Sequence, residues 1–166
     1  MIIVDSNVLA ARTLSCERSY QAIQIESLDN VWLVPCLWRY EFLNILATQI
    51  KAGRVSQQRA RHIFQQVAQL LAENERDPDI ESVLGLVAKH RITAYDAHFV
   101  ALAQTAGCLL VTEDAELLNK FPGCAISMDA FISRHGSADR VHEASAPYHI
   151  RGHSSSRPAR TALINR

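Results

Sequence analysis

The spacing of apolar residues along the chain predicts an alternation of short buried strands and helices. Met1–Val4, Val31–Val34 and Cys108–Val111 are short apolar runs, each typical of a strand buried on both faces of a parallel sheet. A last strand is expected over Cys124–Ile126. Helices are expected over residues 6–14, 17–28, 36–51, 57–73, 80–90, 94–106 and 115–121, with a helical turn at 129–133. This alternation predicts an α/β fold, with a mostly parallel sheet flanked by helices on both faces.

The stretch from Ile92 to Asp114 is the clearest unit of this pattern. Thr93 is a good N-cap, the apolar residues after it recur at helical spacing, and Gly107 ends the helix before the next strand. A carboxylate stands at each end of the unit, Asp96 in the first turn of the helix and Asp114 just past the strand. Both are expected at the same edge of the sheet, where open α/β folds place their sites.

The chain divides into a domain and a tail by composition. Residues 1–133 carry the periodic pattern, and their number suits one domain. Residues 134–166 have little apolar periodicity and are rich in Arg, Ser and His, so we predict a disordered tail. The tail histidines are irregularly spaced, which favours a solvated segment over a metal site.

Charge excludes one class of protein. The formal net charge is zero, but residues 1–133 carry 11 Lys and Arg against 15 Asp and Glu, a balance of −4, while residues 134–166 carry +4. The folded part is therefore not a general basic nucleic-acid binder. Any polyanion that it handles must be held by local cations or by metal ions.

The cysteines and the hydropathy of the chain indicate in which cellular compartment the protein is expected. The four cysteines are scattered and lack metal-site spacing, so we predict reduced core residues of a cytoplasmic protein. No apolar run approaches the roughly 20 residues of a transmembrane helix, and no basic region precedes the first strand as in a signal peptide. The sequence therefore predicts no membrane partner.

The candidate chemistry lies in the placement of acids. Asp5 follows the first strand, Asp114 follows the third, and Glu41 is expected in the middle of a helix on a face that is otherwise apolar. A lone carboxylate on such a face would cost several kcal/mol if it were buried without a partner. A site that needs negative charge explains Glu41 better than a solvated surface does.

Each acid also has a simpler interpretation. Asp5 and Asp114 could be helix N-caps, Asp96 could complete a capping box with Thr93, and Glu41 could reach solvent at a groove edge. Jointly, several carboxylates at one sheet edge would repel one another unless a cation held them. Mg²⁺ or Mn²⁺ fits because these ions take oxygen ligands and keep waters for the substrate. Two such ions about 3.5–4 Å apart suit in-line attack on a phosphodiester.

Three segments in order resemble a known family. MIIVDSNVLA, PCLWRYEFLNIL and ITAYDAHFVALAQTAGCLLVTED together resemble the PIN-domain ribonucleases of the VapC toxin type, over Met1–Phe131. No motif is specific singly, but the ordered set is. The resemblance assigns the catalytic and metal-holding acids of the family to this sequence as follows: Asp5, Glu41, Asp96 and, in a T-x-D motif that begins at Thr112, Asp114. Asn7 matches the polar position of the D-x-N start.

The resemblance implies both a fold and an activity. The fold would be PIN-like, related to the Rossmann arrangement, and the activity would be cleavage of single-stranded RNA with Mg²⁺ or Mn²⁺, with two ions when substrate is bound. Toxins of this type are usually homodimers that a small cognate antitoxin inhibits. The leading hypothesis is therefore an endoribonuclease toxin, with RNA preferred only through the resemblance.

Other residues and other functions stay open. Asn7 and Thr112 are candidates for orienting a ligand. Phosphate contacts could come from basic residues, although a solvated surface is the favoured interpretation for each: Arg12, Arg39, Lys51 and Arg54. One alternative is a PIN nuclease without a toxin role, acting in RNA processing or on DNA. The other is a catalytically silent module that binds metal or nucleic acid, with the acids holding a structural ion.

Overall fold

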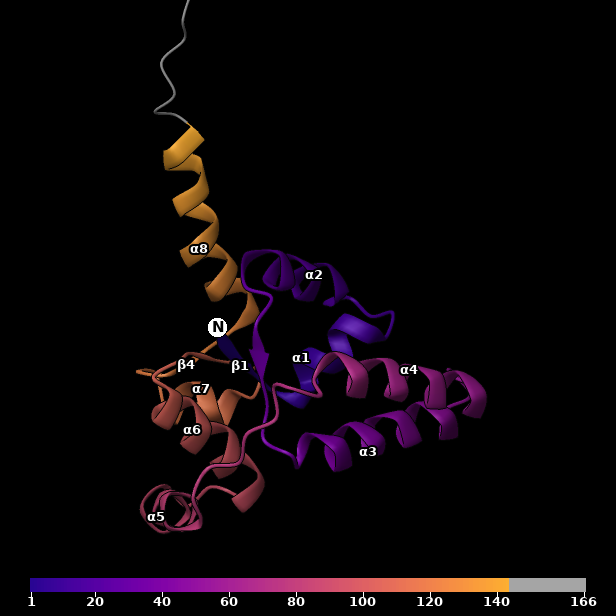
Figure 1. Cartoon of the computed structure of the whole chain (residues 1–166), viewed down its shortest axis with the longest axis horizontal. Helices are drawn as coiled ribbons and strands as arrows, with labels where there is room; N and C mark the ends of the chain where they lie inside the picture. The colour runs from indigo at the N-terminus through magenta and orange to yellow at the C-terminus, as the bar shows by residue number, and fades with distance from the viewer. Residues whose placement is uncertain (144–166) are drawn as a thin grey trace, which may run out of the picture.

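The computed structural model describes the backbone of residues 1–143 and the side chains of residues 1–136. Along this part of the chain each strand is followed by one, two or four helices (Figure 1). The strands are β1 (Ile2–Val4), β2 (Trp32–Leu33), β3 (Leu110–Val111) and β4 (Ala125–Ile126). The helices are α1 (Ser6–Thr13), α2 (Ser19–Leu28), α3 (Trp38–Lys51), α4 (Gln57–Leu70), α5 (Ile80–His90), α6 (Ala94–Ala106), α7 (Ala115–Lys120) and α8 (Met128–Glu143).

The four strands form one parallel sheet in the order β2-β1-β3-β4. Ile3 of β1 lies at the centre, in register with Leu33 on one side and Leu110 on the other. All three side chains are buried. The prediction of a parallel sheet is confirmed, and the carboxyl ends of its strands meet at one edge.

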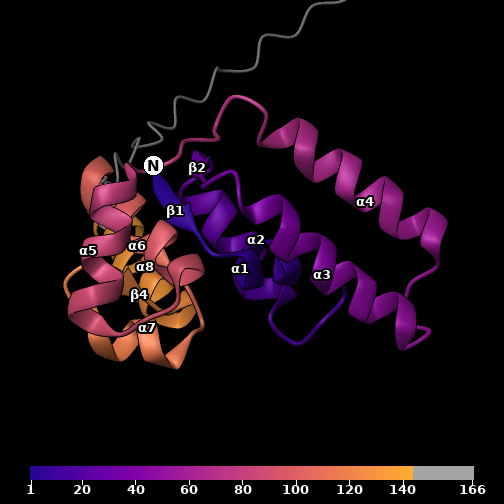
Figure 2. The same cartoon turned by 90° about the horizontal axis from the view of Figure 1, so that it is seen from below.

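Helices cover both faces of the sheet, as predicted. Successive residues of β1 point to opposite faces: Ile2 and Val4 belong to a core with α1, α2, α3, α4 and α8, whereas Ile3 belongs to a core with α5, α6 and α7. Figure 2 shows α5, α6 and α7 gathered at one side of β1, and α3 and α4 at the other.

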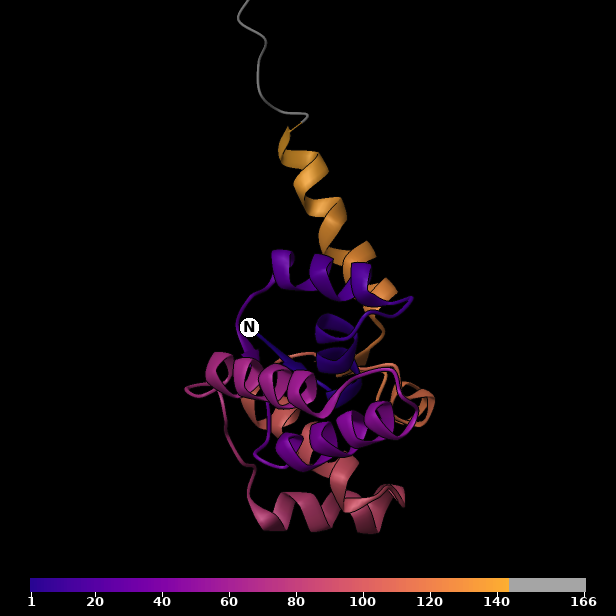
Figure 3. The ribbon, with the colours of Figure 1, turned by 90° about the vertical axis from the view of Figure 1, so that its right-hand side faces the viewer.

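Aromatic packing joins α3 to α4. The ring of Trp38 lies 5.9 Å from Phe42 and 5.7 Å from Phe64, centroid to centroid. Trp38 and Phe42 are fully buried, and each contributes on the order of 2–3 kcal/mol by leaving water. The two helices extend together away from the sheet (Figures 1 and 2), and Figure 3 shows them from that side, one beside the other. This packing fixes the direction of α3, which carries Glu41.

The central unit forms as predicted. The Thr93 side chain accepts a hydrogen bond from the Asp96 N–H at 3.1 Å, which starts α6. Gly107, with φ of 63°, ends it in the left-handed conformation that favours glycine. Five successive residues of α6, 99–103, are buried, so this helix packs on β1 and β3 as well as on α5.

Three expectations are corrected. Helix α3 begins at Trp38, which puts Glu41 in its first turn and not mid-helix; the Cys36 N–H bonds instead to the Asp77 carboxylate at 2.8 Å. The helical turn expected at 129–133 is the start of the longer α8, which packs on α2 and passes the predicted domain boundary. Cys16 is exposed and not in the core.

Two sequence expectations are limited by what the structure describes. The predicted disorder of residues 144–166 lies outside the described residues. Within residues 1–143, none of the helices is both long enough and apolar enough to cross a bilayer.

Candidate active site

Asp5 is held where two strands end. It follows β1, and its backbone N–H donates to the Val111 carbonyl of β3 at 3.0 Å. The buried Thr112 hydroxyl donates to Asp5 Oδ2 at 2.5 Å, and Asn7 Nδ2 donates to the same oxygen at 2.7 Å. One side chain from the end of β3 and one from α1 therefore converge on one carboxylate oxygen of Asp5.

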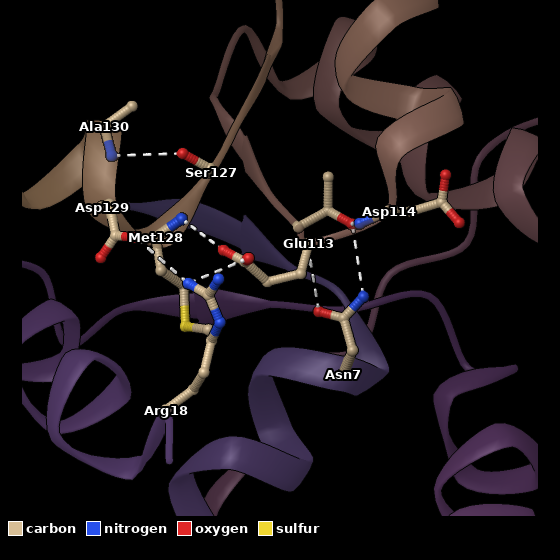
Figure 4. Close-up of polar contacts among 9 residues, drawn as sticks. Asn7, Arg18, Glu113, Asp114, Ser127, Met128, Asp129 and Ala130 are labelled. Carbon is tan, nitrogen blue, oxygen red and sulfur yellow. Dashed lines mark hydrogen bonds and ion pairs between the residues drawn. The ribbon is translucent and has the colours of Figure 1, made fainter.

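Asn7 and Thr112 also fix the loop that leaves β3. The Thr112 hydroxyl accepts from the Asp114 N–H at 3.0 Å, and Asn7 Oδ1 accepts from the Glu113 N–H at 3.4 Å. Figure 4 shows Asn7 facing this loop from α1. The two residues that were predicted to orient a ligand thus orient the acid-bearing loop.

Glu41 reaches the same edge from α3. Its Oε2 accepts a hydrogen bond from the hydroxyl of Ser6 at 2.6 Å. Ser6 is 3% exposed and begins α1 directly after Asp5. The contact between Ser6 and Glu41 could not be predicted from the sequence, because it depends on how α1 and α3 pack.

Asp96 lies at the start of α6, where the Thr93 hydroxyl donates to its Oδ2 at 2.6 Å. This is not a full capping box, since the carboxylate bonds to the Thr93 hydroxyl and not to its backbone N–H. Of the two hydrogen bonds of a capping box, the one from the Asp96 N–H to the Thr93 side chain is therefore present, and the one from the Thr93 N–H to the Asp96 carboxylate is not.

Electrostatics link three of the acids. Burial raises the pKa of Asp5, the Thr112 hydrogen bond and the N–H groups of Asn7 and Ser6 lower it, and the charge of Asp96 raises it further. Burial likewise raises the pKa of Glu41, the Ser6 hydrogen bond lowers it, the charges of Asp5 and Asp96 raise it, and the charge of His98 on α6 lowers it. Asp5, Glu41 and Asp96 therefore lie within electrostatic reach of one another and repel.

Asp114 is placed differently. Its Oδ1 accepts from the Leu117 N–H at 2.9 Å and so caps α7, as the simpler interpretation holds. In Figure 4 its carboxylate points away from Glu113 and Asn7. The charge of Asp96, and not that of Asp114, is among the main causes of the raised pKa values of Asp5 and Glu41.

Two of the candidate arginines are already paired. The guanidinium of Arg12 binds Glu26 of α2 at 2.7 Å, and that of Arg39 binds Glu75 at 2.5 Å while lying over the Trp38 ring. Lys51 and Arg54, by contrast, form no ion pair within the part of the chain whose side chains are described. A phosphate contact by Arg12 or Arg39 would have to share a guanidinium that already binds a carboxylate.

A set of contacts around Glu113, which we call the clasp, was not predicted from the sequence. Glu113 Oε1 accepts from the Met128 N–H at 2.9 Å, and its Oε2 pairs with Arg18 at 3.1 Å. Arg18 also reaches Asp129 at 3.2 Å (Figure 4). The clasp ties the loop between Thr112 and Asp114 to the starts of α2 and α8, and no periodic pattern in the sequence links these segments.

The donor set fits a hard divalent cation in an open site. Each of the four acids has one carboxylate oxygen held by a donor, and its second oxygen has no side-chain donor within residues 1–136. These second oxygens are Oδ1 of Asp5, Oε1 of Glu41, Oδ1 of Asp96 and Oδ2 of Asp114. None of the four forms an ion pair with a basic residue there. Among the described residues, no three or more His, Cys, Asp or Glu side chains lie close enough together to hold one metal ion. Mg²⁺ sites commonly use only one or two carboxylates and keep waters.

Comparison with known proteins gives a consistent result. The family model described as PIN domain matches residues 2–122. Ribonuclease VapC3 from Pyrobaculum aerophilum is 30% identical over 124 residues, which cover 73% of this chain and 95% of that protein. Exonuclease VapC9 from the same organism is 34% identical over 95 residues, or 57% of this chain and 70% of that protein.

Solved structures show the same fold. The crystal structure of PAE2754 from Pyrobaculum aerophilum has a TM-score of 0.64 and 26% identity, covering 82% of this chain and 96% of that one. A toxin–antitoxin complex from Klebsiella pneumoniae has a TM-score of 0.54 and 16% identity, covering 77% and 98%.

Proposed function

Because the chain belongs to the PIN-domain family, we propose that it is a divalent-metal-dependent endoribonuclease and the toxin of a toxin–antitoxin pair. One observation carries the proposal. Three mutually repelling carboxylates, Asp5, Glu41 and Asp96, stand at one sheet edge, each with an oxygen left without a side-chain donor. Repulsion among the three carboxylates lowers the stability of the fold unless a bound cation offsets it.

Asp5, Glu41 and Asp96 would hold the ion, and Asp114 would complete the set with the oxygen that the α7 cap leaves free. Bound Mg²⁺ or Mn²⁺ would supply positive charge that lowers the pKa of an attacking water and offsets the charge developing on the phosphate. Hydrolysis adds the water oxygen to phosphorus and breaks one P–O bond, and the leaving oxygen takes up a proton.

The protein's own residues prepare the site. Thr112 and Asn7 hold Asp5 by the same oxygen, so the carboxylate cannot rotate when its other oxygen binds a ligand. Ser6 does the same for Glu41. Ligands held in advance lose little entropy on binding. We therefore assign to Asn7 and Thr112 the positioning of Asp5 and of the loop after β3, in place of direct phosphate contact.

The test is cleavage of a labelled single-stranded RNA by purified protein, with Mn²⁺ and with EDTA. Asp5→Asn and Asp96→Asn should each abolish cleavage while far-UV circular dichroism stays unchanged, since they remove charge and not core volume. Asp79→Asn is the matched control, because Asp79 begins α5 and pairs with Ser82 at 2.6 Å as Asp96 pairs with Thr93. Wild-type cleavage by both site variants would exclude these acids as the catalytic set.

Two features of the activity need their own measurement. One relative is named a ribonuclease and the other an exonuclease, so a circular RNA should be used beside a linear one. Cleavage of the circle supports an endonuclease, and resistance of the circle with loss of the linear RNA supports an exonuclease. Parallel reactions on single-stranded DNA test the alternative substrate, because attack by water needs no ribose 2′-hydroxyl.

The proposal also includes two protein partners, an antitoxin and a second copy of this chain. The predicted antitoxin would be a small protein encoded beside this one that suppresses cleavage at equimolar amounts, and the predicted homodimer is tested by light scattering. The cytoplasmic location stays a prediction. A catalytically silent module, the remaining alternative, would gain thermal stability from Mn²⁺ but cleave neither RNA nor DNA.

A further inference from the structure

Two exposed tyrosines flank the candidate active site. Tyr40 immediately precedes Glu41 on α3 and is 75% exposed; Tyr95 immediately precedes Asp96 on α6 and is 62% exposed. Both line one surface hollow of about 380 Å³, together with Glu41 and Asn44. The hollow is therefore continuous with the acid cluster at Glu41.

Neither tyrosine has an evident structural role. Within residues 1–136, neither ring packs against another aromatic ring, and neither hydroxyl forms a hydrogen bond. Exposure alone is weak evidence, since Tyr20 on α2 is 69% exposed and lies outside the hollow. The distinguishing feature of Tyr40 and Tyr95 is that two different helices bring them to the same hollow, each beside a candidate metal ligand.

The charge of the hollow limits what it can hold. None of its four lining residues is basic, and Glu41 is acidic, so it offers nothing to attract a phosphate. It does offer two aromatic faces and the amide of Asn44. An uncharged planar group with hydrogen-bonding edges fits this chemistry, and stacking on aromatic side chains is how proteins commonly hold unpaired bases.

We propose that the hollow is a nucleobase subsite, in which a base next to the cleaved phosphodiester stacks on Tyr40 and Tyr95 while Asn44 bonds its edge. The inference rests on the proposed ribonuclease function. A base inside a duplex cannot leave its stack without cost, whereas an unpaired base can enter directly. The subsite thus gives this chain its own physical reason to act on single-stranded RNA.

The expected effects follow from stacking. Tyr40→Ala and Tyr95→Ala should each lower kcat/KM on single-stranded RNA by about tenfold, within the roughly 5- to 150-fold range of base stacking. The loss should fall mainly on KM, because the acids are untouched. Tyr40→Phe and Tyr95→Phe should retain activity within about twofold, since phenylalanine keeps the ring. Tyr20→Ala is the control for removing an equally exposed tyrosine.

The deciding experiment combines these variants with RNA that lacks one base. A series of oligonucleotides carries a single abasic nucleotide at successive positions around the cut. At one position, removing the base should lower the wild-type kcat/KM by about the same tenfold, and Tyr40→Ala should then cost nothing more. Such non-additivity shows that ring and base contact each other; a purely structural role for Tyr40 would lower kcat/KM on every oligonucleotide alike.

The outcomes separate the two proposals. If the wild type cleaves RNA and the alanine variants match it, the subsite is wrong and the ribonuclease stands. Uniform losses on all abasic substrates, or altered oligomeric state in light scattering, would instead assign the tyrosines to folding or to a protein interface and overturn the subsite. If the wild type cleaves no RNA at all, the ribonuclease proposal fails and the subsite fails with it.

Discussion

Asp96→Asn tests the shared metal site through stability and needs no substrate. In the folded protein the Asp96 carboxylate accepts from the Thr93 hydroxyl at 2.6 Å, and its charge raises the pKa values of Asp5 and Glu41. Asparagine keeps an oxygen that can accept the same hydrogen bond but removes the charge. The substitution therefore sets a weakened hydrogen bond against relief of two repulsions.

The two effects can be sized. Replacing a charged acceptor by a neutral one at this half-exposed position costs about 0.5–1 kcal/mol. Each repulsion between nearby unit charges in a well-hydrated setting is worth on the order of 1 kcal/mol, and Asp96 faces two of them. The net gain is about 1–1.5 kcal/mol, so in EDTA the variant should melt about 2–6 °C above the wild type.

Metal should remove most or all of this advantage. An ion present at about 100 times its dissociation constant stabilises the wild type by roughly 2.7 kcal/mol, which for a chain of this size raises Tm by about 5–11 °C. If losing Asp96 weakens metal affinity about tenfold, the variant gains roughly 1.4 kcal/mol less. Differential scanning calorimetry on both proteins, with Mn²⁺ and with EDTA, measures all four values.

Asp79→Asn again supplies the control. Asp79 also begins a helix and pairs with a hydroxyl, but its pKa is lowered, first by the Ser82 hydrogen bonds, and no other acid raises it. It should lose a little stability in either buffer and respond to Mn²⁺ as the wild type does. The shared site is refuted if Asp96→Asn behaves like this control, or if the wild-type Tm ignores metal.

Three further predictions concern the surroundings of the site. Because the pKa values of Asp5 and Glu41 are raised in the folded protein, stability without metal should fall as pH rises above their ordinary values of 3.8 and 4.5, and return as pH is lowered again. The difference in Tm between wild type and Asp5→Asn, measured across about pH 4–8, should show this slope. Glu113→Ala, which removes the clasp, should cost about 1–2 kcal/mol and lower kcat, with Glu113→Gln intermediate, by urea unfolding and cleavage assays. Deleting residues 144–166 should leave Tm unchanged, because the described core ends by Ile132.

Local pattern was enough to predict the strands and the helix order. Buried strands in a parallel sheet are continuous apolar runs, so β1 is visible in the sequence as a short apolar stretch that ends at Asp5. The cap at Thr93 and the stop at Gly107 are equally local, and the structure has both. The length of α8 was missed because its contact with α2 comes from tertiary packing and not from its own periodicity.

The site was predictable in part for the same reason. Strand ends in a parallel sheet meet at one edge, so Asp5 and Thr112 could be expected there, and their direct hydrogen bond follows. Partners from other elements could not be predicted: Ser6 on Glu41 depends on how α3 crosses α1, and Arg18 on Glu113 depends on where α8 begins. Pattern locates an acid along the chain, but packing decides what holds it.

The same contacts explain how the chain stays folded around a repulsive cluster. Each of the four acids is bound on one oxygen by a neighbour, and three of those donors are hydroxyls: Thr112 on Asp5, Ser6 on Glu41 and Thr93 on Asp96. A hydroxyl stabilises a carboxylate without adding a full positive charge. An arginine or lysine in its place would bind more strongly and cancel the charge that a metal ion needs. Neutral donors thus limit the cost of the cluster while leaving its negative field available, which is the compromise that a reversible cation site requires.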